Sequence, residues 1–160
     1  MLRIEIITVG KLKEEYLRMA QAEYSKRLTT FCKLTITELK EYRLPENPSL
    51  TQIEQCIVCE GEEILNRIPK SAIVIPLCIE AKQINSEELA KQLLRFAVDG
   101  ESYIIFVIGG SYGLSDAVKQ RGNMKLSMSL MTFPHQLARI MLLEQIYRSF
   151  TINAGTKYHK

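Results

Sequence analysis

The sequence lacks long apolar runs and has few residues that commonly bind metals. Among its 160 residues there are two histidines and four cysteines, and no apolar segment approaches the roughly 18 residues of a membrane-spanning helix. The first ten residues include Arg3 and Glu5, and no cleavage-site pattern follows them, so they do not resemble a signal peptide. We therefore expect a cytoplasmic protein with reduced thiols, without a metal and without contact to a membrane.

The net charge is also small, because 21 Lys and Arg residues oppose 18 Asp and Glu residues, which leaves +3. The excess is unevenly distributed: residues 121–160 carry six basic residues and one acidic residue, Glu144, whereas residues 1–120 sum to −2. Such a segment can present a basic face to the phosphates of a nucleic acid, or its cations can be solvated or salt-bridged. Charge alone leaves both interpretations open.

Short β-branched runs alternate with helical patterns along the whole chain. Strands are predicted at residues 4–9, 34–39, 72–79, 103–108 and 126–133, and helices at 12–31, 50–68, 86–98, from about 115, and at 134–150. The apolar run 103–108 is typical of the middle of a sheet, while the alternation in 34–39 is typical of an edge strand. This order predicts one α/β domain, residues 1–160, with a mainly parallel sheet flanked by helices.

Neither a Walker motif nor a GxGxxG motif is present, but a glycine loop, Gly109–Gly113, follows an apolar strand and precedes a helix. Parallel α/β folds bind ligands at the carboxyl ends of their strands, and glycine lets the backbone approach a ligand closely. The loop is interpreted either as a site for a nucleotide-like group or as a tight turn.

The pair Cys56 and Cys59 has the CxxC spacing of redox and zinc motifs. It falls inside a helical pattern rather than at the start of a helix, and neither a second CxxC nor enough histidines for a zinc site accompany it. A structural role is favoured. A thiol oxidoreductase is the alternative, and it requires a thiol with a low pKa.

Two segments near the carboxyl end are unusual. Residues 126–133 run into Pro134 without a capping Ser, Thr, Asp or Asn, which leaves the first amides of the next helix for a ligand or for the preceding loop. His135, taken by itself, fits a structural role better than a catalytic one. The tail from residue 153 places Tyr and His beside two lysines, either as a frayed end or as a set that contacts RNA.

Taken together, these segments resemble the ribosomal RNA large-subunit methyltransferase H family, small members of the SPOUT (trefoil-knot) methyltransferases. The matching stretches span the chain and read IITVGKLKEEY, EYSKRL, PENPS, EGEEIL, IGGSYGL, LSMSLMTFPHQLARIMLLEQIYRSF and KYHK. The combination of GGSxGL, TFPHQ, EQIYR and a terminal YHK is the most specific part. One position departs from the pattern, because residues 79–82 read IEAK where many members have IxGK, with Ala81 in place of glycine.

The resemblance implies S-adenosylmethionine as the cofactor, held in a knotted carboxyl-terminal half. The positions that match the family's cofactor residues are Leu77, Gly109, Met128, Ser129, Leu130, Met131, Thr132 and Phe133. Leu77 lies at the end of the third predicted strand, Gly109 lies in the glycine loop after the fourth, and residues 128–133 lie in the last strand before Pro134. The ends of three strands are therefore expected to meet in one crevice.

The reaction that the resemblance implies is methylation of N3 of a pseudouridine in a hairpin loop of 23S ribosomal RNA on the assembled ribosome. Arg148, Tyr158 and His159 are expected to hold the flipped-out base and nearby phosphates, with His159 or water as proton acceptor. His135 is expected to shape the site. Family members are homodimers whose tails complete the partner's site, and the consecutive apolar residues 141–143 agree with such an interface. A nonenzymatic nucleotide-binding or ribosome-associated module is the alternative function.

Overall fold

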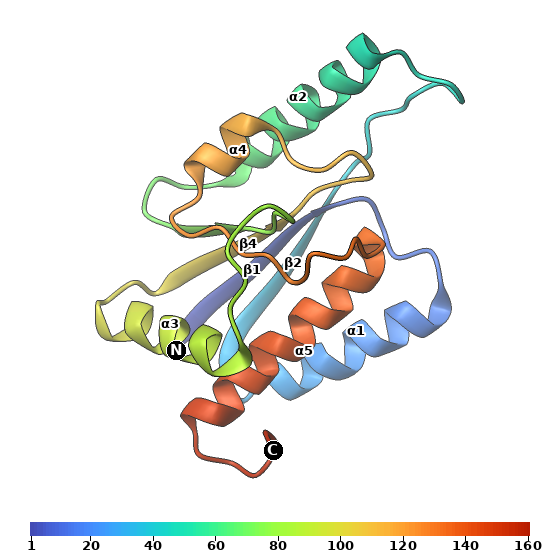
Figure 1. Ribbon diagram of the computed structural model, residues 1–160. Coiled ribbons are helices and arrows are strands. Elements are labelled where there is room, and N and C mark those ends of the chain that lie inside the picture. The colour runs from blue at the N-terminus through green and yellow to red at the C-terminus, as the bar shows by residue number, and fades with distance from the viewer.

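Four parallel strands form one sheet, and helices cover both of its faces (Figure 1). The structure is a computed structural model that describes all 160 residues. The strands are β1 (Leu2–Val9), β2 (Cys32–Leu39), β3 (Ile73–Pro76) and β4 (Tyr103–Ile108), and the helices are α1 (Glu15–Leu28), α2 (Leu50–Arg67), α3 (Ser86–Val98), α4 (Asp116–Arg121) and α5 (His135–Asn153). The strand order is β2-β1-β4-β3, and all neighbouring pairs are parallel. The predicted α/β class with a parallel sheet is confirmed.

Each face of the sheet has its own apolar core. Ile4 and Ile6 of β1 enter the core beneath α1, α3 and α5, whereas Ile7 and Val9 of the same strand enter the core beneath α2 and α4. Consecutive side chains of a strand point to opposite faces, so a strand covered on both sides must be apolar at every position. This explains the uninterrupted run of β4, which lies inside the sheet, and the alternation of β2, which lies at its edge.

None of the five helices is both long and apolar enough to span a membrane.

The predicted fifth strand, residues 126–133, is wrong. This segment makes isolated bridges only at its first two residues and then continues in bends and irregular backbone. The hydroxyl of Ser127 donates to the carbonyl of Ile79, and the hydroxyl oxygen of Ser129 accepts from the N–H of Met131. Such side-chain bonds compete with the bonds of a strand ladder. The alternating pattern therefore forms a loop in which Leu130 and Met131 are 79% and 73% exposed.

The start of this loop is bonded to the chain that follows β3. The N–H of Leu126 donates to the carbonyl of Pro76, the N–H of Cys78 donates to the carbonyl of Leu126, and the N–H of Ser127 donates to the carbonyl of Lys82. The two segments therefore lie side by side just before α5 begins. The trefoil knot that the resemblance implies stays a prediction.

Candidate active site

Three segments of the chain meet around one cavity at the carboxyl ends of β3 and β4. Residues 77–80 follow β3, residues 108–114 follow β4, and residues 128–135 lead into α5; Lys119 of α4 completes the wall. The cavity has a volume of about 720 Å³, which lies within the range of about 300–1,000 Å³ found for small-molecule sites. Ligands of parallel α/β folds bind at such strand ends.

The cavity gathers most of the residues expected to bind the cofactor. Seven of the eight positions line it, namely Leu77, Gly109, Met128, Ser129, Met131, Thr132 and Phe133. Leu130 is the exception, because its side chain points to solvent and does not line the cavity.

The glycine loop is a tight turn and also a wall of the cavity. The N–H of Gly113 donates to the carbonyl of Gly110 at 3.0 Å, and Gly113 has φ of +84°, a conformation that favours glycine. A Cβ atom on Gly109 would lie 2.7 Å from the carbonyl carbon of Gly113. The two interpretations of the loop are therefore compatible, since the turn brings bare backbone to the cavity.

Only three side chains in the cavity wall are charged or titrate near neutral pH: Glu80, Lys119 and His135. The Nζ atom of Lys119 donates to Oε1 of Glu80 at 2.5 Å. This hydrogen bond lowers the pKa of Glu80 and raises the pKa of Lys119, so both side chains are ionised at neutral pH.

His135 is the first residue of α5 and faces the cavity. Pro134 before it provides no side-chain cap, as the sequence predicted, so the first amides of the helix receive no such acceptor. The Nε2 atom of His135 is buried without a hydrogen-bond partner, 4.0 Å from the carboxylate of Glu41. Burial lowers the pKa of His135, which keeps its ring neutral at pH 7. His135 therefore contributes a neutral ring to the cavity wall.

The other three predicted site residues form a cluster around Glu144. The carboxylate of Glu144 accepts from Arg148 Nη2 at 2.6 Å and from the hydroxyl of Tyr158 at 3.0 Å. His159 lies 3.2 Å from Arg148 Nη1 through Nδ1 and 3.2 Å from Glu87 through Nε2. Because a guanidinium only donates and a carboxylate only accepts, His159 carries its proton on Nε2 in this arrangement.

Tyr158 is held as a neutral phenol within this cluster. Desolvation raises its pKa to about 12, with the hydrogen bond to Glu144 as the next cause. Its ring lies under the guanidinium of Arg148, 4.9 Å from the centroid, and packs edge-on against Tyr147. Tyr158 is therefore suited to stacking and hydrogen bonding and not to accepting a proton.

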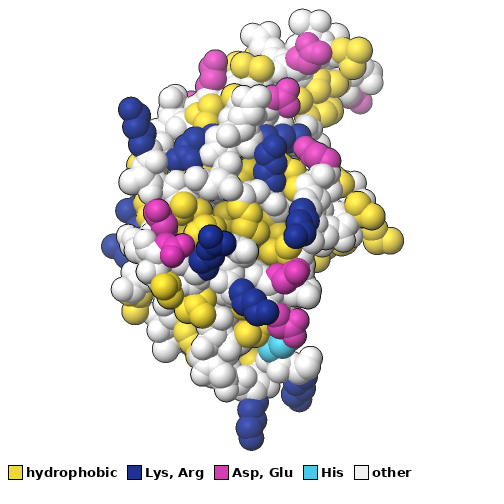
Figure 2. All heavy atoms as spheres, turned by 60° about the vertical axis from the view of Figure 1, so that its left-hand side comes forward, with side chains coloured by type: hydrophobic (Ala, Val, Ile, Leu, Met, Phe, Trp, Pro, Cys, Tyr) yellow, Lys and Arg dark blue, Asp and Glu magenta, His cyan; other side chains and the backbone are white.

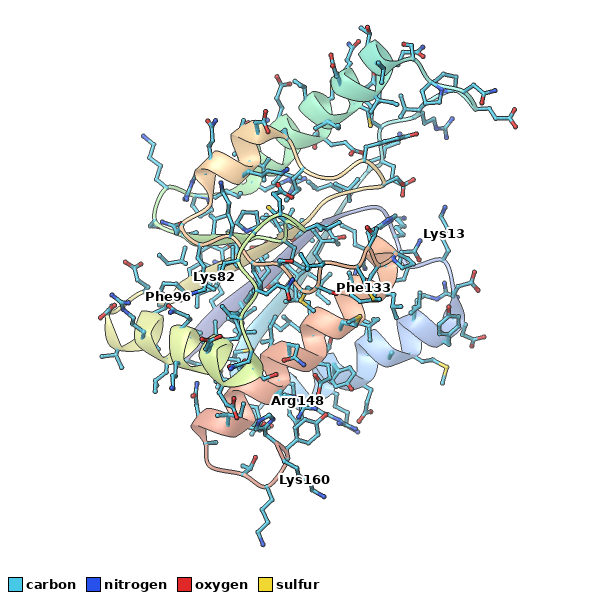
Figure 3. The ribbon with its side chains drawn as sticks, viewed as in Figure 1. Lys13, Lys82, Phe96, Phe133, Arg148 and Lys160 are labelled. Carbon is cyan, nitrogen blue, oxygen red and sulfur yellow. The ribbon has the colours of Figure 1, made fainter.

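The cluster is remote from the cavity within one chain. His135 and Arg148 are 13 residues apart on α5, a separation of about 20 Å at 1.5 Å per residue. Figure 3 shows Phe133 near the upper start of the helix and Arg148 near its lower end. None of the residues Arg148, Tyr158 and His159 lines the cavity. The structure therefore separates them from His135 and from the predicted cofactor positions.

The basic excess of residues 121–160 is only partly exposed. Three of its six basic side chains are bonded inside the protein, namely Arg121 to backbone carbonyls, Arg139 to Glu38 and Arg148 to Glu144. The other three, Lys125, Lys157 and Lys160, are exposed. On the face drawn in Figure 2, Lys and Arg side chains lie among acidic ones around an apolar area. The alternative of bonded cations thus holds for three of these residues, and the nucleic-acid face stays a prediction for the three exposed lysines.

The structure does not support the alternative of a thiol oxidoreductase. Cys56 and Cys59 lie within α2, and burial raises the pKa of Cys56 to about 11. A thiol of this kind stays protonated at neutral pH and is a poor nucleophile. No group of three or more His, Cys, Asp or Glu side chains is arranged to hold a metal ion.

Sequence reasoning missed three charged residues that matter here. Arg139 is fully buried on α5, and it could have been noticed because it lies three to four residues before Leu142 and Leu143, on the same face of the helix. Glu80 and Lys119 are 39 residues apart in the sequence, in a turn and a short helix. No sequence pattern connects them.

The family model described as "Predicted SPOUT methyltransferase" matches residues 2–159. The chain belongs to the SPOUT methyltransferase family. This SPOUT methyltransferase is 53% identical to the ribosomal RNA large subunit methyltransferase H of Bacillus pumilus and 52% identical to that of Leuconostoc mesenteroides subsp. mesenteroides, each over 159 residues. Both alignments cover 99% of this chain and 100% of the relative. The family resemblance drawn from the motifs is confirmed.

A solved structure, that of a probable methylase family protein from Haemophilus influenzae Rd KW20, superposes on this SPOUT methyltransferase with a TM-score of 0.56. The match covers 100% of this chain and 72% of the other, with 15% sequence identity. At this level of identity the likeness concerns the fold.

The cavity of this SPOUT methyltransferase fits the cofactor that the resemblance implies. Ten of its 20 lining residues are hydrophobic, which suits the burial of an adenine ring. The glycine backbone and the hydroxyls of Ser129 and Thr132 supply hydrogen-bonding groups for a ribose, and Glu80 with Lys119 supplies one charge of each sign.

Proposed function

We propose that this protein transfers a methyl group from S-adenosylmethionine to N3 of a pseudouridine in a hairpin loop of 23S ribosomal RNA within the assembled ribosome. The observation that carries the proposal is the cavity formed by the two strand ends, the glycine loop and the start of α5. The names of the relatives, ribosomal RNA large subunit methyltransferase H, support the substrate class.

The cavity holds the cofactor, and the residues lining it set its position. Leu77 and the segment 128–133 enclose the nucleoside, and Gly109 lets the backbone approach it. S-Adenosylmethionine, when bound, supplies a methyl group on a positively charged sulfur that becomes a neutral thioether after transfer. His135, with a neutral ring at the start of α5, shapes the wall of the cavity.

The tail cluster binds the RNA and removes a proton. N3 must approach the methyl carbon in line with the breaking bond and must lose its imide proton. Arg148 exchanges its contact with Glu144 for a phosphate, to which a guanidinium can donate two parallel hydrogen bonds. Once Arg148 has moved, Nδ1 of His159 is free to accept the imide proton, and Tyr158 stacks on a base as a neutral phenol.

The protein acts as a homodimer in which the tail of one chain completes the cavity of the other. This part of the proposal is supported by the 13 residues of α5 that separate His135 from Arg148, a distance that no side chain bridges. Leu130, Met131 and Leu137 near the cavity are exposed apolar side chains, as expected for an interface.

Transfer of a labelled methyl group tests the reaction. Whole ribosomes, separated subunits and naked RNA are incubated with the protein and labelled S-adenosylmethionine, and the modified base is mapped. We expect label on N3 of one pseudouridine in whole ribosomes and little label in naked RNA. Cofactor binding without transfer to any of these substrates would instead support a nonenzymatic module.

Mixing two inactive variants tests the shared site. A His159→Ala chain has an intact cavity, and a Gly109→Val chain has an intact tail. If the tail serves the partner's cavity, random mixed dimers contain one complete site in half of the dimers and regain about one quarter of the wild-type activity. Each variant alone is the control. No recovery in mixtures shown to contain mixed dimers would mean that the tail serves its own chain.

A further inference from the structure

The cavity wall contains an ion pair to which the proposed binding of the nucleoside gives no role. We propose that Glu80 and Lys119 recognise the amino-acid end of the cofactor, with Glu80 taking its ammonium group and Lys119 its carboxylate. This inference rests on the proposed use of S-adenosylmethionine and identifies residues of this chain that select it.

The two residues come from separate elements that meet at the cavity. Glu80 lies in a turn after β3 that the N–H of Ala81 closes by donating to the carbonyl of Cys78 at 3.2 Å. Lys119 lies on α4, one residue after the buried Val118 that anchors this helix. Their charged atoms are 2.5 Å apart, and both side chains line the cavity.

Their partial exposure argues against a purely structural role. The side chains of Glu80 and Lys119 are 63% and 26% exposed, and ion pairs open to solvent add little to stability. Glu80 is also the only carboxylate in the cavity wall, and Lys119 is the only ammonium. Any ligand in this cavity that carries both a cation and an anion meets one opposite charge for each.

An amino-acid group can replace the internal pair without leaving a charge unpaired. Its ammonium and carboxylate are bonded to the same carbon, so they present the two opposite charges at close range. Each side chain then exchanges one charge-assisted hydrogen bond for another. A ligand without this group forfeits both new bonds, which makes the pair a source of selectivity.

Two neighbouring charges provide matched controls. Lys125 also lowers the pKa of Glu80, and Asp116 also raises the pKa of Lys119. Neither residue lines the cavity. Replacing Lys125 therefore changes the charge near Glu80 without changing the wall that a ligand touches.

Calorimetry with two probes tests the inference without methyl transfer. S-Adenosylhomocysteine has the whole amino-acid end, and 5′-methylthioadenosine has the nucleoside thioether without it. We expect the wild-type protein to bind the first probe at least about 10-fold more tightly than the second. Glu80→Gln and Lys119→Met should each weaken binding of S-adenosylhomocysteine about 10-fold and leave 5′-methylthioadenosine within about 2-fold, whereas Lys125→Gln should leave both unchanged within about 2-fold.

The double variant Glu80→Lys/Lys119→Glu separates recognition from simple pairing. It keeps an ion pair but exchanges the positions of the two charges. Its binding of S-adenosylhomocysteine should therefore be as weak as that of the single variants. Recovery of wild-type affinity would show that the pair only closes the wall, and equal losses for both probes in the single variants would show that it only shapes the cavity. Either result overturns the inference, provided that thermal melting shows folded protein. A wild-type protein that binds neither probe overturns the proposed function itself.

Discussion

Two arginines on α5 show how differently the ends of this helix are held. Arg139 near the start is fully buried and donates to Glu38 of β2, to Gln21 of α1 and to the carbonyl of Gly10 after β1. Arg148 near the end is 25% exposed and donates to Glu144, one turn earlier on the same helix. Arg139 therefore bonds the start of α5 to three other parts of the fold, whereas Arg148 bonds only to its own helix and to the tail.

This difference separates the groups that build the cavity from the groups proposed to meet the RNA. The bonds of Arg139 fix the helix start that lines the cavity, so that end keeps one geometry. The bonds of the tail cluster are local and can be exchanged for bonds to a phosphate or a base. Four experiments test this contrast, beginning with the largest expected effect.

Removing the two arginines in turn should affect stability unequally. Arg139→Leu leaves Glu38 without its partner. Breaking a fully buried ion pair lowers the free energy of unfolding by about 3–5 kcal/mol. We expect a loss at the lower end, about 3 kcal/mol, because the side chain of Glu38 is 32% exposed. Arg148→Leu should cost less, about 1–2 kcal/mol, because Glu144, although only 18% exposed, still accepts hydrogen bonds from Gln145 and Tyr158. Urea unfolding measures both variants. Equal losses would mean that the two ends of α5 are held alike.

Removing the tail should abolish methyl transfer and spare the cavity. Deletion of residues 158–160 or His159→Ala should lower the rate of ribosome methylation at least about 100-fold, since it removes the proposed proton acceptor. Binding of S-adenosylhomocysteine should change less than about 2-fold, because all residues proposed to hold the cofactor lie outside the tail. Lys70→Ala, an exposed lysine outside the basic segment 121–160, is the control. Unchanged methylation in both tail variants would remove the tail from the mechanism.

A side chain in the glycine loop should damage the cavity and leave the tail intact. Gly109→Ala places a Cβ atom 2.7 Å from backbone of Gly113, and relieving such an overlap costs about 1–3 kcal/mol. We expect weaker binding of S-adenosylhomocysteine together with a lower melting temperature. Gln120→Ala, an exposed residue of α4 outside the cavity wall, is the control and should change neither. Normal binding by Gly109→Ala would show that the loop is not part of the ligand site.

The smallest expected effect is the pH dependence contributed by His135. Because burial lowers its pKa in the folded state, the unfolded chain binds a proton more readily, and stability falls as the pH drops below the ordinary value of 6.5. His135→Gln should flatten the melting temperature between about pH 5 and pH 7. His159→Gln, at the other end of α5, is the comparison. If the melting temperature of His135→Gln depends on pH as steeply as that of the wild type, a group other than His135 causes the pH dependence.

The sheet and most helices could be predicted from the sequence because their signals are local. The apolar run of β4 and the alternation of β2 follow from burial on two faces and on one. The segment 126–133 carried a false signal, because period-two alternation does not reveal that Ser127 and Ser129 bond to nearby backbone. A strand that is buried on both faces can be recognised by its own apolar residues. The hydrogen bonds of a serine hydroxyl depend on which backbone groups lie beside it in the fold.

The candidate site could be predicted in part, where its signals lie within a short stretch of sequence. The glycine loop and the start of α5 follow directly from recognisable patterns, and the structure places them in one cavity. The separation of Arg148 from His135 depends on the straight course of a long helix, and the pairing of Glu80 with Lys119 depends on tertiary contact. Neither arrangement has a signature within a short window of sequence.

The strand order also has a consequence for the time at which the protein folds during its own synthesis. β1 pairs with β2 about 30 residues later but also with β4, where Ile4 lies beside Ile104. A ribosome that adds about 5–20 residues per second needs about 5–20 s to make the chain between these two partners. During that interval the apolar edge of β1 is unpaired, so the nascent chain depends on the β1–β2 pair and α1 for protection against aggregation.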